Sequence, residues 1–325
     1  MNKIKDKDRL LWADVMKGIG IISVVIGHVY GGGIHKLIFS YHMPLFFFIG
    51  GYFFKPNGSL FYYFKKQSKS LLVPYLSFLT LIYLVFYLPD LIRNSNLENL
   101  LGFVFRPLLG GKWLVSYASV FWFITCYFLT QQTANYLFIK YSDKKLLIIG
   151  SVFLFLSYIN SIYLKDLWVP WNLNVVFAAF PFFLLGFMYS KSKFVIKDTV
   201  LLIISCISIF LVFALDDNTY DMKYSEYGIP LLTFFCSLVL IVFIKRISEI
   251  ISINRYSQFI GQLGKASLVI MYGHQPLQIV LRSYFLDNKF IISFLSITLS
   301  FFLYKVLSSN ESTKFFFLGI KTRKS

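Results

Sequence analysis

Charged residues and cysteines are scarce in this chain of 325 residues, and it has only four histidines. Asp, Glu, Lys and Arg together make up 14% of the sequence, against about 25% in a typical soluble domain. Three cysteines are too few for a secreted scaffold held by disulfides. The 57% of hydrophobic residues exclude a disordered chain and exceed what a soluble protein can bury. The composition therefore predicts an integral membrane protein made of helices.

The chain contains ten long apolar runs, and the length of each is close to the roughly 20 residues that a helix needs to cross a bilayer. These runs are continuous rather than alternating, which disfavours a transmembrane β-barrel. We predict an all-α, polytopic helical bundle that forms one membrane domain over residues 1–325. The predicted spans are 11–31, 36–54, 70–88, 114–138, 146–163, 170–189, 199–215, 227–244, 259–281 and 290–307.

The charges are distributed unevenly between the two sides of this predicted topology. With both termini in the cytoplasm, the cytoplasmic segments hold 23 basic and six acidic residues, whereas the outer segments hold eight of each. The net charge of +17 therefore falls on one side, in agreement with the positive-inside rule. Nucleic-acid binding is not needed to explain the basic excess, and membrane lipid is the expected surrounding of the chain.

The first predicted span contains three ionisable residues, Asp14, Lys17 and His28. A charged side chain at the centre of a membrane helix costs about 2.5–3.5 kcal/mol, so such residues usually serve a function. Eleven residues make about three helical turns and about 16 Å, which places Lys17 and His28 on one face, and Asp14 is within pairing distance of Lys17. We predict that this face lines the bundle interior. The alternative is an interfacial Asp14–Lys17 pair with a snorkelling lysine, and a structural histidine.

Histidines also occur in and near the second predicted span. His42 lies near its outer end, at a depth similar to that of His28, which predicts one shared site. The alternative places His42 at the membrane interface. Pro44 is expected to bend this helix, and His35, just before it, is expected to be exposed.

Two later spans carry weaker signals. Trp122 in the fourth span is interpreted either as a cavity wall or as lipid-facing bulk, and His274 in the ninth belongs to a polar set that is predicted to face inward. The three cysteines lie in spans without metal-ligand spacing, so no metal site is predicted.

A basic segment follows the second span on the predicted cytoplasmic side. Lys65, Lys66 and Lys69 alternate there with aromatic residues in the sequence FYYFKKQSK. The positive-inside rule or binding of anionic lipid explains such a segment. The functional interpretation is a phosphate-binding patch at the mouth of a cavity.

Three sequence motifs resemble those of a known family. Lys17, followed by ten residues and His28, resembles the basic-residue–ten–histidine motif of the acyltransferase 3 family of ten-span bacterial membrane acyltransferases. The run 42–52, HMPLFFFIGGY, is similar to a stretch of the subgroup that includes fucose 4-O-acetylases and exopolysaccharide O-acetyltransferases. The run 263–274, LGKASLVIMYGH, is similar to a segment near the end of that subgroup. Gly50 and Ala266 stand where these relatives usually have Ser and Asn, and neither departure removes an ionisable group.

The resemblance implies an O-acetyltransferase in the cytoplasmic membrane of a bacterium. Acetyl-CoA would be the acyl donor, and the acceptor would be a hydroxyl of a cell-surface carbohydrate or of a lipid-linked glycan. His28 would act as general base or as acyl carrier, with Asp14 and Lys17 positioning each other. The residues expected to hold the donor are Arg9, Lys17, Lys65, Lys66 and Lys69, and those expected to contact the acceptor are His42, Trp122 and His274.

The alternative function is a transporter or flippase for a glycan or glycolipid. Ionisable residues within membrane spans also mark substrate pathways and proton relays. Many transporters contain an inverted repeat, and none is visible in this sequence.

Overall fold

The computed structural model describes residues 2–94, 96–192, 195–254, 257–285 and 288–320, with side chains from Leu11 onward. Within this part of the chain the structure is helical, and no β-strand occurs apart from one isolated bridge between Asp221 and Glu226. The all-α prediction is confirmed. Five helical segments are long and apolar enough to cross a membrane, and they span Leu11–Val29, Leu60–Arg93, Asp143–Tyr163, Pro170–Lys191 and Lys289–Leu307. The chain is thus a multi-pass membrane protein, whereas ten spans and the orientation of the termini stay predictions.

The first two predicted spans have different structures. The first lies in α1 (Asn2–Val29), which is uninterrupted. The second is divided into α2 (Gly32–Phe39) and α3 (His42–Tyr52). Pro44 lacks the N–H that a continuous helix would donate to the Ser40 carbonyl, and the helix is interrupted there. The expected bend is therefore a break, one turn before the proline.

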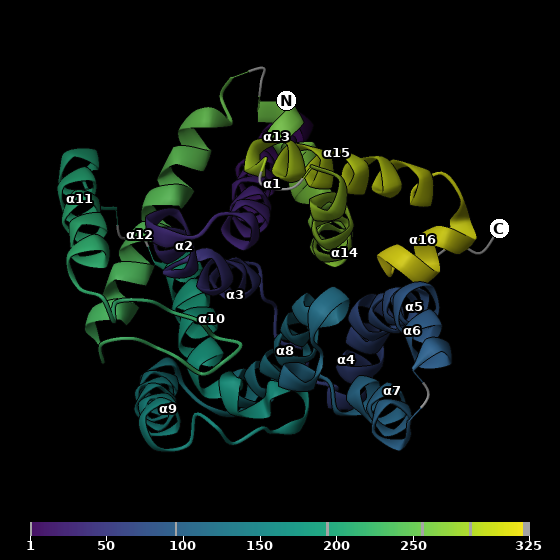
Figure 1. The fold of residues 1–325 in the computed structure, drawn as a ribbon. Coiled ribbons are helices and arrows are strands. Elements are labelled where there is room, and N and C mark those ends of the chain that lie inside the picture. The colour runs from purple at the N-terminus through teal and green to yellow at the C-terminus, as the bar shows by residue number, and fades with distance from the viewer. Residues whose placement is uncertain (1, 95, 193–194, 255–256, 286–287, 321–325) are drawn as a thin grey trace. The chain divides into compact units, whose positions relative to one another are not determined.

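The remaining predicted spans overlap with helices, the ninth being divided between two of them, and additional helices lie outside the predicted spans (Figure 1). Two of the additional helices, α7 and α16, were not predicted. The helices after α3 are α4 (Leu60–Gln67), α5 (Val73–Ile82), α6 (Leu88–Arg93), α7 (Leu97–Leu109), α8 (Trp122–Lys140), α9 (Asp143–Tyr163), α10 (Val176–Lys191), α11 (Asp198–Ala214), α12 (Leu232–Ile251), α13 (Ser257–Lys265), α14 (Ser267–Phe285), α15 (Lys289–Leu307) and α16 (Glu311–Leu318). Short π and 3₁₀ segments join them: η1 (Ser68–Leu72), η2 (Tyr83–Tyr87), η3 (Gly111–Trp113), η4 (Ser116–Phe121) and η5 (Pro170–Val175).

The chain forms two compact units, which we describe separately. The first unit comprises residues 1–55, 142–163 and 177–267, and the second comprises residues 56–141, 164–176 and 268–325. The prediction of a single domain over 1–325 stays a prediction.

In the first unit, α1 packs against α2, α3, α12 and α13. Glycines allow the backbones of α1 and α13 to approach each other closely. A Cβ atom added to Gly264 would lie 1.8 Å from the Asp14 carbonyl oxygen, and one added to Gly18 would lie 2.2 Å from the carbonyl oxygen of Ile260. The pairing of α1 with α13 therefore depends on small residues, as is common between membrane helices.

In the second unit, a nearly continuous helical segment runs from α4 through η1, α5 and η2 to α6. Helix α8 packs against α4 and η1, and α16 packs against α5. Gly110 and Gly111 adopt positive φ angles of 60° and 57° and join α7 to η3, where Lys112 is buried. The Lys112 ammonium group donates a hydrogen bond of 2.8 Å to the Lys165 carbonyl oxygen.

Candidate functional site

The carboxylate of Asp14 is the centre of a small charge cluster in the first unit. Its Oδ1 lies 3.3 Å from the Nζ of Lys17, and its Oδ2 lies 3.9 Å from the Nζ of Lys265. The Asp14 side chain is only 19% exposed. The predicted pairing of Asp14 with Lys17 is therefore present, and Lys265 is a second cation that sequence reasoning did not connect with it.

The packing of α1 against α13 brings Lys265 to Asp14. Lys265 is the last residue of α13, directly after Gly264, whose missing side chain lets the two backbones touch at Asp14. Gly264, which lies within the run 263–274, thus sets the conformation of this charge cluster. The Asp14 carboxylate lies between two ammonium groups, one from α1 and one from α13.

Three of the four histidines of the chain contact the ring of Phe39. The ring centroids of His28, His35 and His42 lie 5.6, 3.8 and 4.5 Å from that of Phe39, and the His35 ring is stacked on it. His28 is half-buried and His42 is buried. His28 and His42 were predicted to share one site, and they contact the same aromatic ring. The expectation that His35 is exposed is wrong, because His35 is half-buried against that ring.

Backbone carbonyls fix the tautomers of two of these histidines. The Nδ1 atoms of His35 and His42 lie 2.9 Å from the carbonyl oxygens of Gly27 and Ile38. A carbonyl can only accept a hydrogen bond, so each Nδ1 donates its proton to the carbonyl oxygen. These two bonds orient the rings of His35 and His42 beside Phe39.

A hydrogen bond between side chains ties the start of α3 to α1. The hydroxyl groups of Ser23 and Tyr41 lie 2.9 Å apart. Tyr41 directly precedes His42, at the point where the second predicted span is interrupted. The bond therefore fixes the position of this point relative to α1, the helix that carries His28.

The other predicted acceptor residues belong to the second unit. Trp122 begins α8 and is buried, with 6% of its surface exposed. His274 is completely buried in α14, and its Nδ1 lies 2.9 Å from the Ile270 carbonyl oxygen. Burial disfavours the interpretation of Trp122 as lipid-facing bulk. A role for either residue in acceptor binding stays a prediction.

Three of the four predicted donor-binding lysines belong to the second unit, whereas Lys17 belongs to the first. Lys65, Lys66 and Lys69 are all exposed, on α4 and η1. Among the described residues none of the three forms an ion pair. Arg9 lies in α1, but its side chain is outside the described part of the chain.

A buried cation near Trp12 was missed by the sequence analysis, which counted it only as a topological charge. The ammonium group of Lys245 forms an ion pair with Glu249 and lies 4.9, 5.9 and 5.2 Å from the ring centroids of Trp12, Tyr52 and Tyr189. Cation–π contacts of this kind stabilise a desolvated charge. Lys245 thus joins α1, α3, α10 and α12. The only feature of the sequence that indicates an ion pair of Lys245 is Glu249, four residues later on the same helix.

No group of three or more His, Cys, Asp or Glu side chains within the described ranges is arranged to hold a metal ion. In the first unit, the imidazole of His28 and the Asp14–Lys17 ion pair lie on the same helix, α1. Such groups suit proton transfer to or from a hydroxyl.

Comparison with known proteins gives one match. A family model described as an acyltransferase domain, that of acyltransferase 3, matches residues 10–308. This range covers most of both units. Searches among curated proteins and among solved structures found no match.

Proposed function

Since the chain belongs to the acyltransferase 3 family, we propose that it moves an acetyl group from acetyl-CoA to a hydroxyl of a cell-surface carbohydrate. The enzyme class is that of an acyltransferase, and the family resemblance noted in the sequence is confirmed. The subgroup of fucose 4-O-acetylases and exopolysaccharide O-acetyltransferases, the cytoplasmic membrane of a bacterium and the choice of acetyl-CoA are parts of the proposal.

The exposed lysines of α4 and η1 support binding of the donor. Lys65 and Lys69 are four residues apart, and Lys66 lies beside them, so that the three present a basic surface without a carboxylate partner among the described residues. Acetyl-CoA carries several phosphate charges and is made in the cytoplasm, on the side where the topology prediction places this segment. Unpaired cations on a helical surface are suited to such a polyanion.

His28 supports the chemical step. In the proposed reaction its imidazole removes the proton from the acceptor hydroxyl while the hydroxyl oxygen attacks the thioester carbonyl. The C–S bond then breaks, and the proton is passed to the departing thiolate of CoA, which leaves an acetyl ester and a free thiol. A variant of this path forms an acetyl-histidine first, with the thiolate leaving before the hydroxyl attacks.

The charge cluster at Asp14 supports a positioning role for Lys17. Lys17 lies about 16 Å along α1 from His28, since His28 comes eleven positions later on one continuous helix. An elongated donor can therefore contact Lys17 with one part while its thioester reaches His28. His35 and His42, which contact the same ring as His28, fit a role in orienting the acceptor.

The family match over residues 10–308 is the observation that carries this proposal. Surface polysaccharide should be prepared from cells that carry the gene, from cells that lack it and from complemented cells. We expect proton NMR spectra to show an O-acetyl resonance that disappears without the gene and returns on complementation. Identical spectra from all three preparations would exclude surface carbohydrate as the acceptor.

A further inference from the structure

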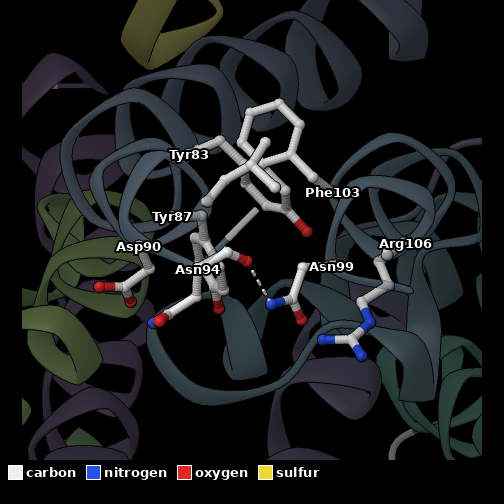
Figure 2. A pocket seen from close by; sticks show the side chains of 9 residues that line it. Tyr83, Tyr87, Asp90, Asn94, Asn99, Phe103 and Arg106 are labelled. Carbon is white, nitrogen blue, oxygen red and sulfur yellow. Dashed lines mark hydrogen bonds between the residues drawn. The ribbon is translucent and has the colours of Figure 1, made fainter. Parts of the chain in front are cut away.

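A polar pocket in the second unit is not used by the proposed chemistry. It has a volume of about 350 Å³ and lies between η2, α6 and α7. Figure 2 shows aromatic side chains on one side of it and polar side chains around the rest. Helix α7 was not predicted from the sequence, so the pocket could not be predicted either.

The aromatic side is formed by Tyr83, Tyr87 and Phe103. The π segment η2 stacks the rings of Tyr83 and Tyr87, with centroids 4.5 Å apart and planes inclined by 22°, and Phe103 meets Tyr83 edge-on at 5.3 Å. The Tyr87 hydroxyl donates a hydrogen bond to the Val115 carbonyl oxygen, which fixes its ring. π segments within helices often occur at functional sites. This one gives the pocket a rigid apolar wall.

The polar side is formed by Asp90, Asn94, Asn99 and Arg106. The Asn99 Nδ2 atom donates a hydrogen bond of 2.8 Å to the Asn94 carbonyl oxygen, so its Oδ1 is directed elsewhere as an acceptor. The Asp90 carboxylate and the Arg106 guanidinium lie on opposite sides of the pocket in Figure 2, and within the described residues they form no ion pair. The pocket thus presents both hydrogen-bond donors and acceptors.

The absence of a side chain at Gly102 leaves space for the side chain of Arg106. A Cβ atom added to Gly102 would lie 3.2 Å from the Nε atom and 3.3 Å from the Cζ atom of Arg106, one turn later on α7. The guanidinium group therefore lies along the helix and lines the pocket. Glycine inside a helix costs roughly 0.5–1 kcal/mol relative to alanine. A side chain at this position would fill part of the pocket.

The charges of the pocket select the class of ligand. An anion would meet the carboxylate of Asp90, and a cation would meet the guanidinium of Arg106. A neutral ligand rich in hydroxyl groups satisfies both, because a hydroxyl donates to a carboxylate and accepts from a guanidinium. A sugar ring also has an apolar C–H face, which suits the stacked tyrosines. We propose that this pocket binds one neutral sugar ring of the carbohydrate acceptor.

This proposal rests on the proposed function, and it adds a binding site for the acceptor. In the predicted topology the loop between the third and fourth spans, residues 89–113, lies on the outer side, where a surface glycan is available. The test measures sugar binding without acetyl-CoA, so its result does not depend on whether acyl transfer takes place.

Binding should be measured on the full chain in micelles of dodecyldimethylamine oxide, whose headgroup is not a sugar. The probes are the methyl glycosides of glucose, galactose, fucose and N-acetylglucosamine, together with glucuronic acid and glucosamine as charged competitors. Saturation-transfer NMR then reports contact and affinity. We expect at least one neutral glycoside to bind.

Two variants test the pocket itself. Arg106→Ala removes the guanidinium, and Gly102→Leu fills the space while favouring the helix, so each should weaken binding of that glycoside at least tenfold. Arg93→Ala and Glu98→Gln are matched controls on α6 and α7 whose side chains do not line the pocket, and they should stay within twofold of the wild type.

Three results would overturn the proposal. The first is that no neutral glycoside binds. The second is binding that survives in both Arg106→Ala and Gly102→Leu. The third is glucuronic acid or glucosamine binding more than tenfold tighter than every neutral glycoside, which would show a site for a charged ligand instead.

Discussion

The charged residues of the two units differ in whether they have partners. In the first unit, Asp14 lies between two lysines, and Lys245 is held by Glu249 and three aromatic rings. In the second unit, the three lysines of α4 and η1 and the arginine of the pocket have no ion-pair partner among the described residues. Charges that already have partners fix a geometry, whereas exposed and unpaired charges are available to a ligand.

This difference suggests a division of tasks. The first unit holds the histidines around Phe39 on a closely packed scaffold, which suits a chemical step that needs fixed geometry. The second unit presents exposed cations and an open polar pocket, which suit the binding of donor and acceptor. Variants in the first unit should therefore mainly lower kcat, and variants in the second should mainly raise KM.

Outside the histidines around Phe39, the largest effect is expected from Gly264→Ala. The new Cβ atom would lie 1.8 Å from the Asp14 carbonyl oxygen, so α1 and α13 must separate. Overpacking of this kind costs about 1–3 kcal/mol and more where backbone is involved. We expect thermal unfolding in detergent to begin at a clearly lower temperature, with loss of activity. Gly31→Ala is the control, since nothing lies within 4 Å of its added Cβ atom, and equal stability of both variants would contradict the close packing.

Removal of the cation beside Asp14 should give the next largest effect. Lys17→Ala leaves a carboxylate that is only 19% exposed with the more distant Lys265 as its remaining partner. We expect kcat for acetyl transfer to fall by about 10- to 100-fold, which corresponds to about 1.4–2.7 kcal/mol.

The conservative variant separates charge from structure. Lys17→Arg keeps the positive charge and should restore most of the activity, while the expression level of both variants stays that of the wild type. If Lys17→Ala keeps kcat within threefold of the wild type, the Asp14–Lys17 pair is an interfacial pair without a part in the reaction.

A smaller effect is expected from the exposed lysines of the second unit. Lys66→Ala combined with Lys69→Ala should raise KM for acetyl-CoA about three- to tenfold and leave kcat nearly unchanged, because solvent screens these side chains. Lys144→Ala combined with Lys145→Ala removes the same charge from another exposed segment on the predicted cytoplasmic side. If the two double variants have equal effects, Lys66 and Lys69 serve only as topology signals.

The smallest effect concerns the loop between α11 and α12. Burial lowers the pKa of Lys223 from its ordinary value of 10.5 to about 8. Between these two values the unfolded chain binds more protons than the folded one, so stability should rise with pH there. We expect a gain of about 1 kcal/mol between pH 7 and pH 9 in unfolding experiments, relative to Lys223→Gln. A parallel pH dependence of both proteins would contradict the burial of this ammonium group.

Local sequence patterns predicted what depends on neighbours along the chain. Each of the ten apolar runs contains helical residues, although the second and ninth are divided between two helices, and Asp14 and Lys17 pair because they are one helical turn apart. The break before α3 follows from the missing N–H of Pro44, but its position one turn earlier was not anticipated.

Contacts between distant segments could not be predicted in the same way. Lys265 reaches Asp14 only because Gly264 brings α13 onto α1, and His35 is half-buried only because α2 turns back on α1. The polar pocket requires α7, which contains Gly102 and Pro107 and was not predicted as a helix. A single sequence does not show which residues vary together. Such covariation would indicate which elements pack against each other.

The most direct test of the account is the rate of acetyl transfer by His28→Ala, measured with purified protein at saturating acetyl-CoA and glycan. A general base usually contributes about 10²- to 10⁴-fold to the rate. The account predicts a fall of kcat of this size, with KM for acetyl-CoA nearly unchanged and with normal insertion in the membrane. A variant that keeps more than about a tenth of the wild-type kcat would contradict the assignment of the chemistry to His28.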